Sequence, residues 1–410
     1  MLKKTLLSKA SAAVCLCGAM LPFSAGAQDY TQGFRYGDRL MISPYVNVEV
    51  IHDSNIIYAH DARGDWIYRI NPGADFFYKA DEWGLIGNVW YAHNWYDKYD
   101  VKDEHRFGER LSLYRESPKG WKATLSESYT ESDQNDAQWL DGGNGIWRNR
   151  HYFDVYGTLS YALSERLSAG INVMFSDMWY ANKGEKYQVL NGWKNWAVGG
   201  EVSYALSARS RAVVMGSYQE YYSGAKNMMF GRTSRAYSLQ GGFMSGLTER
   251  IRYRATVGAS MYDYAGEQTF GPSYMLDASW KISDKLAATV AGAGYFQPSE
   301  TSYYQRKTVY TVSGGLTYRP MKRVTMTGDL IYRGEDNQTV DGYSAYLADY
   351  TRNQYTARLR AAYALHRYAS VYVAGEYTYQ DANYTYQASD RSYYDDWDRY
   401  RLIVGLSLRY

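Results

Sequence analysis

The chain alternates apolar and polar residues over most of its length. In the last segment, 400–410, every second residue is apolar or aromatic: Tyr400, Leu402, Val404, Leu406, Leu408 and Tyr410. Arg401 and Arg409 lie on the opposite face. Strict alternation predicts a β-strand with one apolar and one polar face. A soluble domain would bury these leucines in its core, whereas a membrane barrel would turn them outward to lipid.

Breaks of two lengths alternate between such segments. Eight short breaks lie at 79–83, 117–120, 163–166, 206–210, 247–250, 283–285, 319–323 and 365–367. Nine longer polar breaks lie at 52–65, 99–105, 131–150, 181–192, 223–232, 265–271, 298–307, 334–350 and 381–396. This pattern predicts an all-β fold, an antiparallel transmembrane β-barrel of about 18 strands with short periplasmic turns and long extracellular loops. A soluble β-sandwich is the alternative, but it gives no reason for turn length to alternate.

The two faces of the predicted strands differ in chemistry. In segment 251–261 the odd positions are apolar, whereas the even positions include Arg252 and Arg254. An arginine or lysine facing the bilayer midplane costs about 2–4 kcal/mol. We therefore expect the arginines to face the lumen and the apolar residues to face lipid.

The amino terminus predicts an exported protein. Lys3, Lys4 and Lys9 precede an apolar stretch that ends in Ala25-Gly26-Ala27, which is typical of a signal peptide over 1–27 cleaved between Ala27 and Gln28. A membrane-anchoring helix is the alternative, but it needs a longer apolar run. The predicted organisation is thus a leader 1–27, a short periplasmic segment 28–40 and a barrel 41–410. Both cysteines, Cys15 and Cys17, fall in the leader, so no disulfide is expected in the mature chain.

Aromatic composition fits the bacterial outer membrane as the location. The chain has 46 tyrosines and 12 tryptophans but only 11 phenylalanines, and its mean hydropathy is −0.53. Rings with a polar tip suit the boundary between water and lipid. Tyrosines recur just before the short breaks, as in 159–163 and 361–365, where we expect a periplasmic aromatic girdle or, alternatively, a repeated hairpin-turn preference.

Strand parity predicts a basic lumen. Twelve basic side chains fall on that face: Arg69, Arg106, Arg110, Lys122, Arg252, Arg254, Lys281, Arg333, Arg358, Arg360, Arg401 and Arg409. Seven acidic ones share it: Glu49, Asp75, Asp154, Glu201, Asp277, Asp329 and Glu376. A net positive wall concentrates anions, and guanidinium groups pair well with carboxylate and phosphate. Among them Tyr45, Tyr156 and Tyr372 offer flat faces for sugar rings. The alternative is that these charges form salt-bridge ladders that only stiffen the wall.

Four residues and one loop do not follow the simple scheme. Glu109 and Glu127 fall on the lipid face by parity, which implies bulged strands or a position near a rim. Pro44 and Pro72 lie inside the first two strands, so the seam between first and last strand is expected to be irregular or the first strand short. Loop 131–150 is long enough to fold inward as a plug, although we favour an ordinary exposed loop.

Catalytic and cofactor signals are weak. The six histidines are scattered with no i,i+4 pair for a metal, and no nucleophile motif such as G-x-S-x-G is present. The acidic run Asp390, Asp395, Asp396 and Asp398 could bind a divalent ion shared with lipopolysaccharide, or form a solvated loop. We predict no enzymatic activity, no cofactor, no catalytic or metal site, and no nucleic-acid partner.

One stretch, 44–78, resembles the opening of the porin-2-like outer-membrane barrels of Gram-negative bacteria, which are often found beside exopolysaccharide export functions. Those begin with V-x-V-x-Y-D-S-N-I and then pass through P-G. The matching residues here are Val48, Val50, Asp53, Ser54, Asn55, Ile56, Pro72 and Gly73, with His52 in place of the usual tyrosine. The resemblance covers under a tenth of the chain. It implies a large outer-membrane barrel that passes surface polysaccharide, similar in size to alginate-export barrels with their basic interior.

Three functions remain open. The first is a passive conduit for anionic solutes or a secreted polysaccharide, the second a general or sugar-selective diffusion porin, and the third a closed-barrel adhesin or scaffold. Expected partners are outer-membrane lipid and lipopolysaccharide, the barrel assembly machinery and periplasmic polysaccharide-export components. Tyr410, an aromatic residue that ends an amphipathic strand, resembles the carboxy-terminal signal by which outer-membrane barrels are recognised for insertion.

Overall fold

The computed structural model describes residues 33–58, 60, 62–99, 103–118, 120–135, 147–180, 192–223, 233–246, 248–264, 266–298, 304–339, 350–386, 391–394 and 396–410. The predicted leader, its cleavage site at Ala27 and Gln28, and residues 28–32 lie outside these ranges. Within them, no helix is long and apolar enough to cross a membrane.

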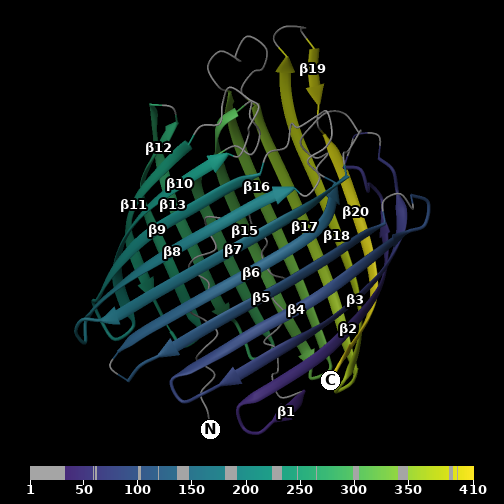
Figure 1. Cartoon of the computed structure of the whole chain (residues 1–410), viewed down its shortest axis with the longest axis horizontal. Coiled ribbons are helices and arrows are strands. Elements are labelled where there is room, and N and C mark those ends of the chain that lie inside the picture. Colours follow the sequence, from purple (N-terminus) through teal and green to yellow (C-terminus); the bar gives the residue numbers. More distant parts are fainter. Residues whose placement is uncertain are drawn as a thin grey trace.

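Eighteen long strands form a closed antiparallel barrel, as predicted. Figure 1 shows them running obliquely around the barrel, with the longer connections at one end and the short turns at the other. The strands are β2 (Leu40–Asp53), β3 (Asp65–Lys79), β4 (Trp83–Tyr96), β5 (Glu104–Glu116), β6 (Trp121–Asn135), β7 (Trp147–Ala162), β8 (Leu167–Tyr180), β9 (Trp193–Ala205), β10 (Ser210–Ser223), β11 (Thr233–Ser245), β12 (Ile251–Tyr264), β13 (Glu267–Lys281), β14 (Leu286–Pro298), β15 (Tyr304–Met321), β16 (Val324–Thr339), β17 (Tyr350–His366), β18 (Ala369–Tyr386) and β20 (Trp397–Arg409).

Two short strands extend the barrel at its ends. β1 (Phe34–Tyr36) pairs with the start of β2, and the ring of Phe34 stacks on Tyr410 at 4.4 Å between centroids. β19 (Arg391–Tyr394) pairs with the upper end of β18 and stands above the rim in Figure 1. The predicted periplasmic segment 28–40 therefore contains a strand. Gly37, with φ 63°, forms the turn that brings β1 back onto β2.

One predicted long loop is wrong. β12 ends at Tyr264 and β13 begins at Glu267, so the break expected over 265–271 is a tight turn. Extracellular strand ends also run into other predicted loops, as where β16 continues to Thr339 and β18 to Tyr386. Antiparallel pairing can continue through polar sequence above the membrane, because ladder hydrogen bonds do not depend on side-chain polarity.

The outer wall is apolar in the way that lipid requires. Leu359, Val257 and Leu330 are 67–71% exposed although they lie in mid-strand. Polar side chains lie on the other face, as Arg358 and Arg360 do on either side of Leu359. A closed barrel satisfies every backbone group internally, which is what allows such a wall to face hydrocarbon. The protein is therefore located in the bacterial outer membrane.

The seam is regular, so the irregularity expected from the prolines is wrong. β2 pairs with β20 without a shift from Tyr45 opposite Arg409 to Asp53 opposite Arg401. Pro44 and Pro72 both keep their places in the β2–β3 register. The ladder between β3 and β4 has no partner for Pro72, but it resumes in the same register at Gly73. Proline has no backbone N–H to donate, so it is tolerated where the ladder lacks a hydrogen bond.

Glu109 and Glu127 face lipid without any bulge. The β4–β5, β5–β6 and β6–β7 ladders run without register shifts, with Glu109 opposite Tyr129 and Glu127 opposite Leu111. Leu125, two residues from Glu127 on the same face, is 51% exposed. The alternative of bulged strands is therefore wrong.

Candidate functional site in the lumen

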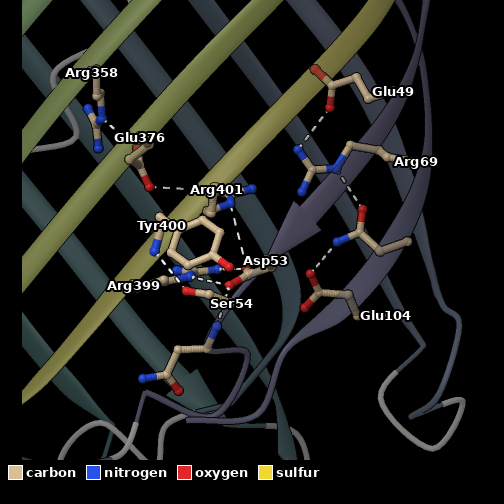
Figure 2. Close-up of polar contacts among 12 residues, drawn as sticks. Glu49, Asp53, Ser54, Arg69, Glu104, Arg358, Glu376, Arg399, Tyr400 and Arg401 are labelled. Carbon is tan, nitrogen blue, oxygen red and sulfur yellow. Dashed lines mark hydrogen bonds and ion pairs between the residues drawn. The ribbon is translucent and has the colours of Figure 1, made fainter.

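The richest polar arrangement lies on the inner wall on both sides of the seam. We call it the charged arc, and it comprises the lumenal charged residues of β17, β18, β20 and β2 to β5. Figure 2 shows much of it, from Arg358 through Asp53 to Glu104. Strands from both ends of the chain are neighbours here because β20 pairs with β2.

Asp53 anchors the arc at the extracellular end of β2. Its side chain is fully buried, and its carboxylate accepts a hydrogen bond from Nε of Arg399 at 2.8 Å and a second from the Nη2 group of the same residue. Nε of Arg401 lies 3.6 Å from the same carboxylate. A bidentate guanidinium–carboxylate pair is among the stronger polar contacts in proteins. It ties the first long strand to the last.

The two residues after Asp53 bind the backbone of β20. Ser54 exchanges two hydrogen bonds with Tyr400, donating its N–H to the carbonyl at 3.0 Å and accepting the Tyr400 N–H on its hydroxyl at 2.8 Å. Asn55 donates its side-chain amide to the Asp398 carbonyl at 2.9 Å. The segment Asp53-Ser54-Asn55, which carries the resemblance noted above, is therefore a seam clasp.

The loop after the clasp folds against the inner wall. Ile56 and Ile57 are buried with Ile51 and Ile67, which lie on the lumenal faces of β2 and β3. The guanidinium of Arg399 lies 4.3 Å above the ring of Tyr58. Within the described residues, this loop covers part of the lumenal wall. The central part of 131–150, from 136 to 146, lies outside them.

Ion pairs and amides continue the arc on both sides of the clasp. On one side Glu376 accepts from Nε of Arg358 at 2.7 Å and lies 3.5 Å from Arg401. On the other side, Arg69 binds Glu49 at 3.1 Å. It also donates to the amide oxygen of Asn94 at 2.6 Å. Further contacts join Asn94 to Glu104 and Glu104 to Arg106.

A tyrosine bridges the seam in the middle of the arc. The hydroxyl of Tyr372 on β18 donates to Glu49 on β2, across the intervening strand β20. Gly405 is the residue of β20 that lies between them in register. Arg360 stacks on the ring of Tyr372, with its guanidinium carbon 4.2 Å from the centroid. No carboxylate of the described residues forms an ion pair with Arg360.

Most of the predicted lumenal cations are in ion pairs. Nine of the twelve have a carboxylate partner: Arg69, Arg106, Lys122, Arg254, Lys281, Arg333, Arg358, Arg401 and Arg409. Among the others, Arg360 stacks on Tyr372 and has no carboxylate partner in the described part of the chain. The structure thus contains the salt-bridge ladders that the sequence left as an alternative.

The ion pairs differ in burial according to their position along the strand. Lys122 with Glu116 and Lys281 with Asp284 lie exposed at the periplasmic rim. There the hydrogen bond and charge of Lys281 lower the pKa of Asp284. Arg333 instead belongs to a buried group near the extracellular end, where Glu335 is 2% exposed. Its carboxylate meets Arg333 at 2.5 Å, Arg352 at 3.8 Å and Lys307 at 4.0 Å.

Parity assignments missed several lumenal groups. Asp53, Glu104, Lys307 and Glu335 lie on the inner face of strands that extend beyond the predicted boundaries. Arg352 and Arg399 lie on the inner face within the predicted strands but are absent from the predicted set. Arg211, near the periplasmic end of β10, was also missed; it donates to Ser168 at 3.0 Å and lies within 3.4 Å of Ser203. Continuing the same parity two residues past each predicted strand end finds Asp53, Glu104, Lys307 and Glu335.

The wall from β6 to β13 differs from the charged arc. Its inner face carries paired hydroxyl and amide groups, including Ser168 with Ser203 at 2.8 Å, Ser217 with Ser238 at 2.6 Å and Gln219 with Asn195 at 3.0 Å. We call this wall the neutral arc after these uncharged pairs. It also carries ion pairs, Arg254 with Glu201 in mid-wall and Lys122 with Glu116 and Lys281 with Asp284 at the periplasmic rim. No group of three or more His, Cys, Asp or Glu residues in the described part of the chain could hold a metal ion.

Comparisons with known proteins add little beyond this geometry. No family model and no curated protein match the chain. The siderophore receptor PirA from Pseudomonas aeruginosa is 10% identical, with a TM-score of 0.45 over 92% of this chain and 81% of that one. The FrpB iron transporter from Neisseria meningitidis is 7% identical, with a TM-score of 0.48 over 94% and 83%. Likenesses this distant carry no argument about function, and the resemblance to porin-2-like barrels stays a prediction.

Proposed function

We propose that the barrel is a passive conduit through the outer membrane that prefers anionic solutes, with a secreted acidic polysaccharide as the favoured substrate class. A barrel of this strand number is too wide for its own side chains to fill. The observation that carries the proposal is Arg360, a guanidinium in the middle of the charged arc that is held on Tyr372 and has no carboxylate partner among the described residues.

Charge balance around Arg360 supports an anion preference. Five arginines of the arc near the seam, Arg69, Arg358, Arg360, Arg399 and Arg401, face four carboxylates, Glu49, Asp53, Asp65 and Glu376. An arginine paired with a carboxylate contributes little to the electrostatic potential at a distance. The unpaired positive charge raises the potential in the lumen and so concentrates anions there. A guanidinium also matches the planar oxygens of a carboxylate on an acidic sugar.

The neutral arc supports a sugar polymer over a small ion. Hydroxyl and amide groups along β6 to β13 can exchange hydrogen bonds with sugar hydroxyls while carboxylates follow the opposite, charged wall. In this proposal the periplasmic export components deliver the polymer to the lumen. The same neutral arc favours a second candidate, a diffusion porin for uncharged sugars.

Conductance across a planar bilayer tests both candidates. We expect ion-conducting channels whose reversal potential in a salt gradient shows anion preference, and we expect Arg360→Ser to reduce that preference. Arg115→Ser is the matched control, because Arg115 pairs with Glu82 at the exposed periplasmic rim. Absence of conductance would support the closed-barrel adhesin instead. Cation preference, or an unchanged ratio in Arg360→Ser, would overturn the proposed anion path and leave the neutral porin.

A further inference from the structure

Two histidines face each other on the outer wall near the extracellular end of the β4–β5 hairpin. His93 on β4 is directly opposite His105 on β5 in an unshifted register. They are twelve positions apart in sequence, so no local spacing rule detects them. The next pair in the ladder, Asn94 and Glu104, is bonded at 2.5 Å on the inner face. Since side chains alternate, both histidines project to the outer face.

The pair is close enough to share a ligand. Directly opposed residues of an antiparallel ladder have Cβ atoms about 4.5–5.5 Å apart. Two imidazoles at this separation can converge on one ion, since each metal–nitrogen bond is about 2.0–2.1 Å long. The hydroxyl of Tyr91 lies 3.5 Å from Nδ1 of His93, so this contact can fix the tautomer that leaves Nε2 as the metal ligand.

The surroundings leave the pair accessible. His105 is exposed, and the rings around the pair are outward aromatics: Trp95 is 44% and Tyr91 is 41% exposed. Trp95 lies edge-on to His93 with centroids 4.4 Å apart. Exposed tyrosine and tryptophan mark the level of the lipid headgroups, where ions and water reach the protein.

We propose that His93 and His105 form a binding site for a divalent transition-metal ion, Cu²⁺, Ni²⁺ or Zn²⁺. Imidazole nitrogen suits these three ions, and Cu²⁺ binds most tightly for a given ligand set. Water completes the coordination in the absence of a third protein ligand among the described residues. The bound ion links β4 to β5 and so stabilises the hairpin that leads to loop 97–103. This inference is independent of what the lumen conducts.

Cu²⁺ binding to the full-length mature barrel in detergent, prepared without a histidine tag, tests the site. We expect one Cu²⁺ with two nitrogen ligands in its electron paramagnetic resonance spectrum, and an affinity about 10- to 100-fold lower in His93→Ala and in His105→Ala. His52→Ala is the matched control, because His52 is also outward and aromatic-flanked but lies opposite Trp66 and Leu402.

The outcomes separate clearly. Circular dichroism verifies that each variant is folded, and Ni²⁺ should raise the melting temperature of the native barrel and of His52→Ala but of neither pair variant. Equal Cu²⁺ affinity in the native barrel, His93→Ala and His105→Ala would overturn the proposal. A loss of Cu²⁺ affinity in His52→Ala as large as in the pair variants would also overturn it, since the ion would then bind exposed histidines whether or not they face each other.

Discussion

Tyr372 reaches across strand β20 and donates its hydroxyl hydrogen to Glu49 on β2. The contact links residues 323 positions apart, and it needs a gap in the strand that lies between them. Gly405 provides that gap, because a Cβ atom at this position would come within 2.3 Å of the Tyr372 ring. A glycine of the final strand therefore determines the contact of a tyrosine and a glutamate on its two neighbours.

Gly405→Ala tests this dependence. The added methyl group would displace the Tyr372 ring and with it Arg360, and we expect the free energy of unfolding to fall by about 1–3 kcal/mol. Urea unfolding in lipid vesicles, followed by tryptophan fluorescence, measures it. Gly375→Ala is the control, because nothing lies within 4 Å of a Cβ atom there. Equal effects of the two substitutions would contradict the role assigned to Gly405.

Asp53→Asn should weaken the seam strongly. The substitution leaves Arg399 and Arg401 without their shared carboxylate, and removing one partner of a buried pair costs about 3–5 kcal/mol. Glu116→Gln removes the partner of Lys122 at the exposed rim, where we expect about 0–1 kcal/mol. The same urea titration compares them. A similar, small loss in both variants would show that the clasp does not hold the first and last strands together.

Ion selectivity should follow net lumenal charge and not the number of arginines. Arg254 is paired with Glu201 at 2.5 Å. Arg254→Gln alone should shift the reversal potential away from anions by an amount similar to Arg360→Ser. The double variant Arg254→Gln, Glu201→Gln keeps the net charge and should keep the native potential. A shift in the double variant as large as in the single one would mean that Arg254 contacts the permeating ion directly.

Glu127→Leu should stabilise the barrel. Glu127 faces lipid between Leu111 and Val155, and a carboxylate there costs free energy, although less than an arginine or lysine. We expect a gain of about 1 kcal/mol in urea unfolding. Glu220→Leu is the comparison, because Glu220 is directly opposite Arg235 and should show no gain. A loss of stability in Glu127→Leu would instead reveal a partner for this carboxylate in the membrane.

Strand number and face could be predicted from the sequence, because both follow from alternation and from the length of the breaks. The eighteen strands and the inward position of Arg358 and Arg360 are examples. Side-chain partners could not be predicted, because the hairpin pattern gives which strands are neighbours but not the register between them. The contact of Arg399 with Asp53 depends on the closing register of β2 and β20, which no local pattern encodes.

Boundaries limited the rest of the prediction. The clusters of polar residues around Asp53 and Glu335 predict loops, yet both residues lie in strands that continue above the lipid. Alternation weakens in those extensions, since neither face contacts hydrocarbon. The residues that hold the extracellular end of the lumen therefore fall where the hydrophobic pattern is least informative.

The seam clasp also bears on the order in which the barrel can assemble. Its two halves, Asp53 and Arg399, are 346 residues apart, so none of its bonds can form until the last strand has been synthesised and delivered. Before that moment β2 and β18 are open edges that can pair with any strand nearby. The clasp can therefore form only with the β2–β20 pairing that closes the barrel. The same bonds must break whenever the barrel opens at this seam.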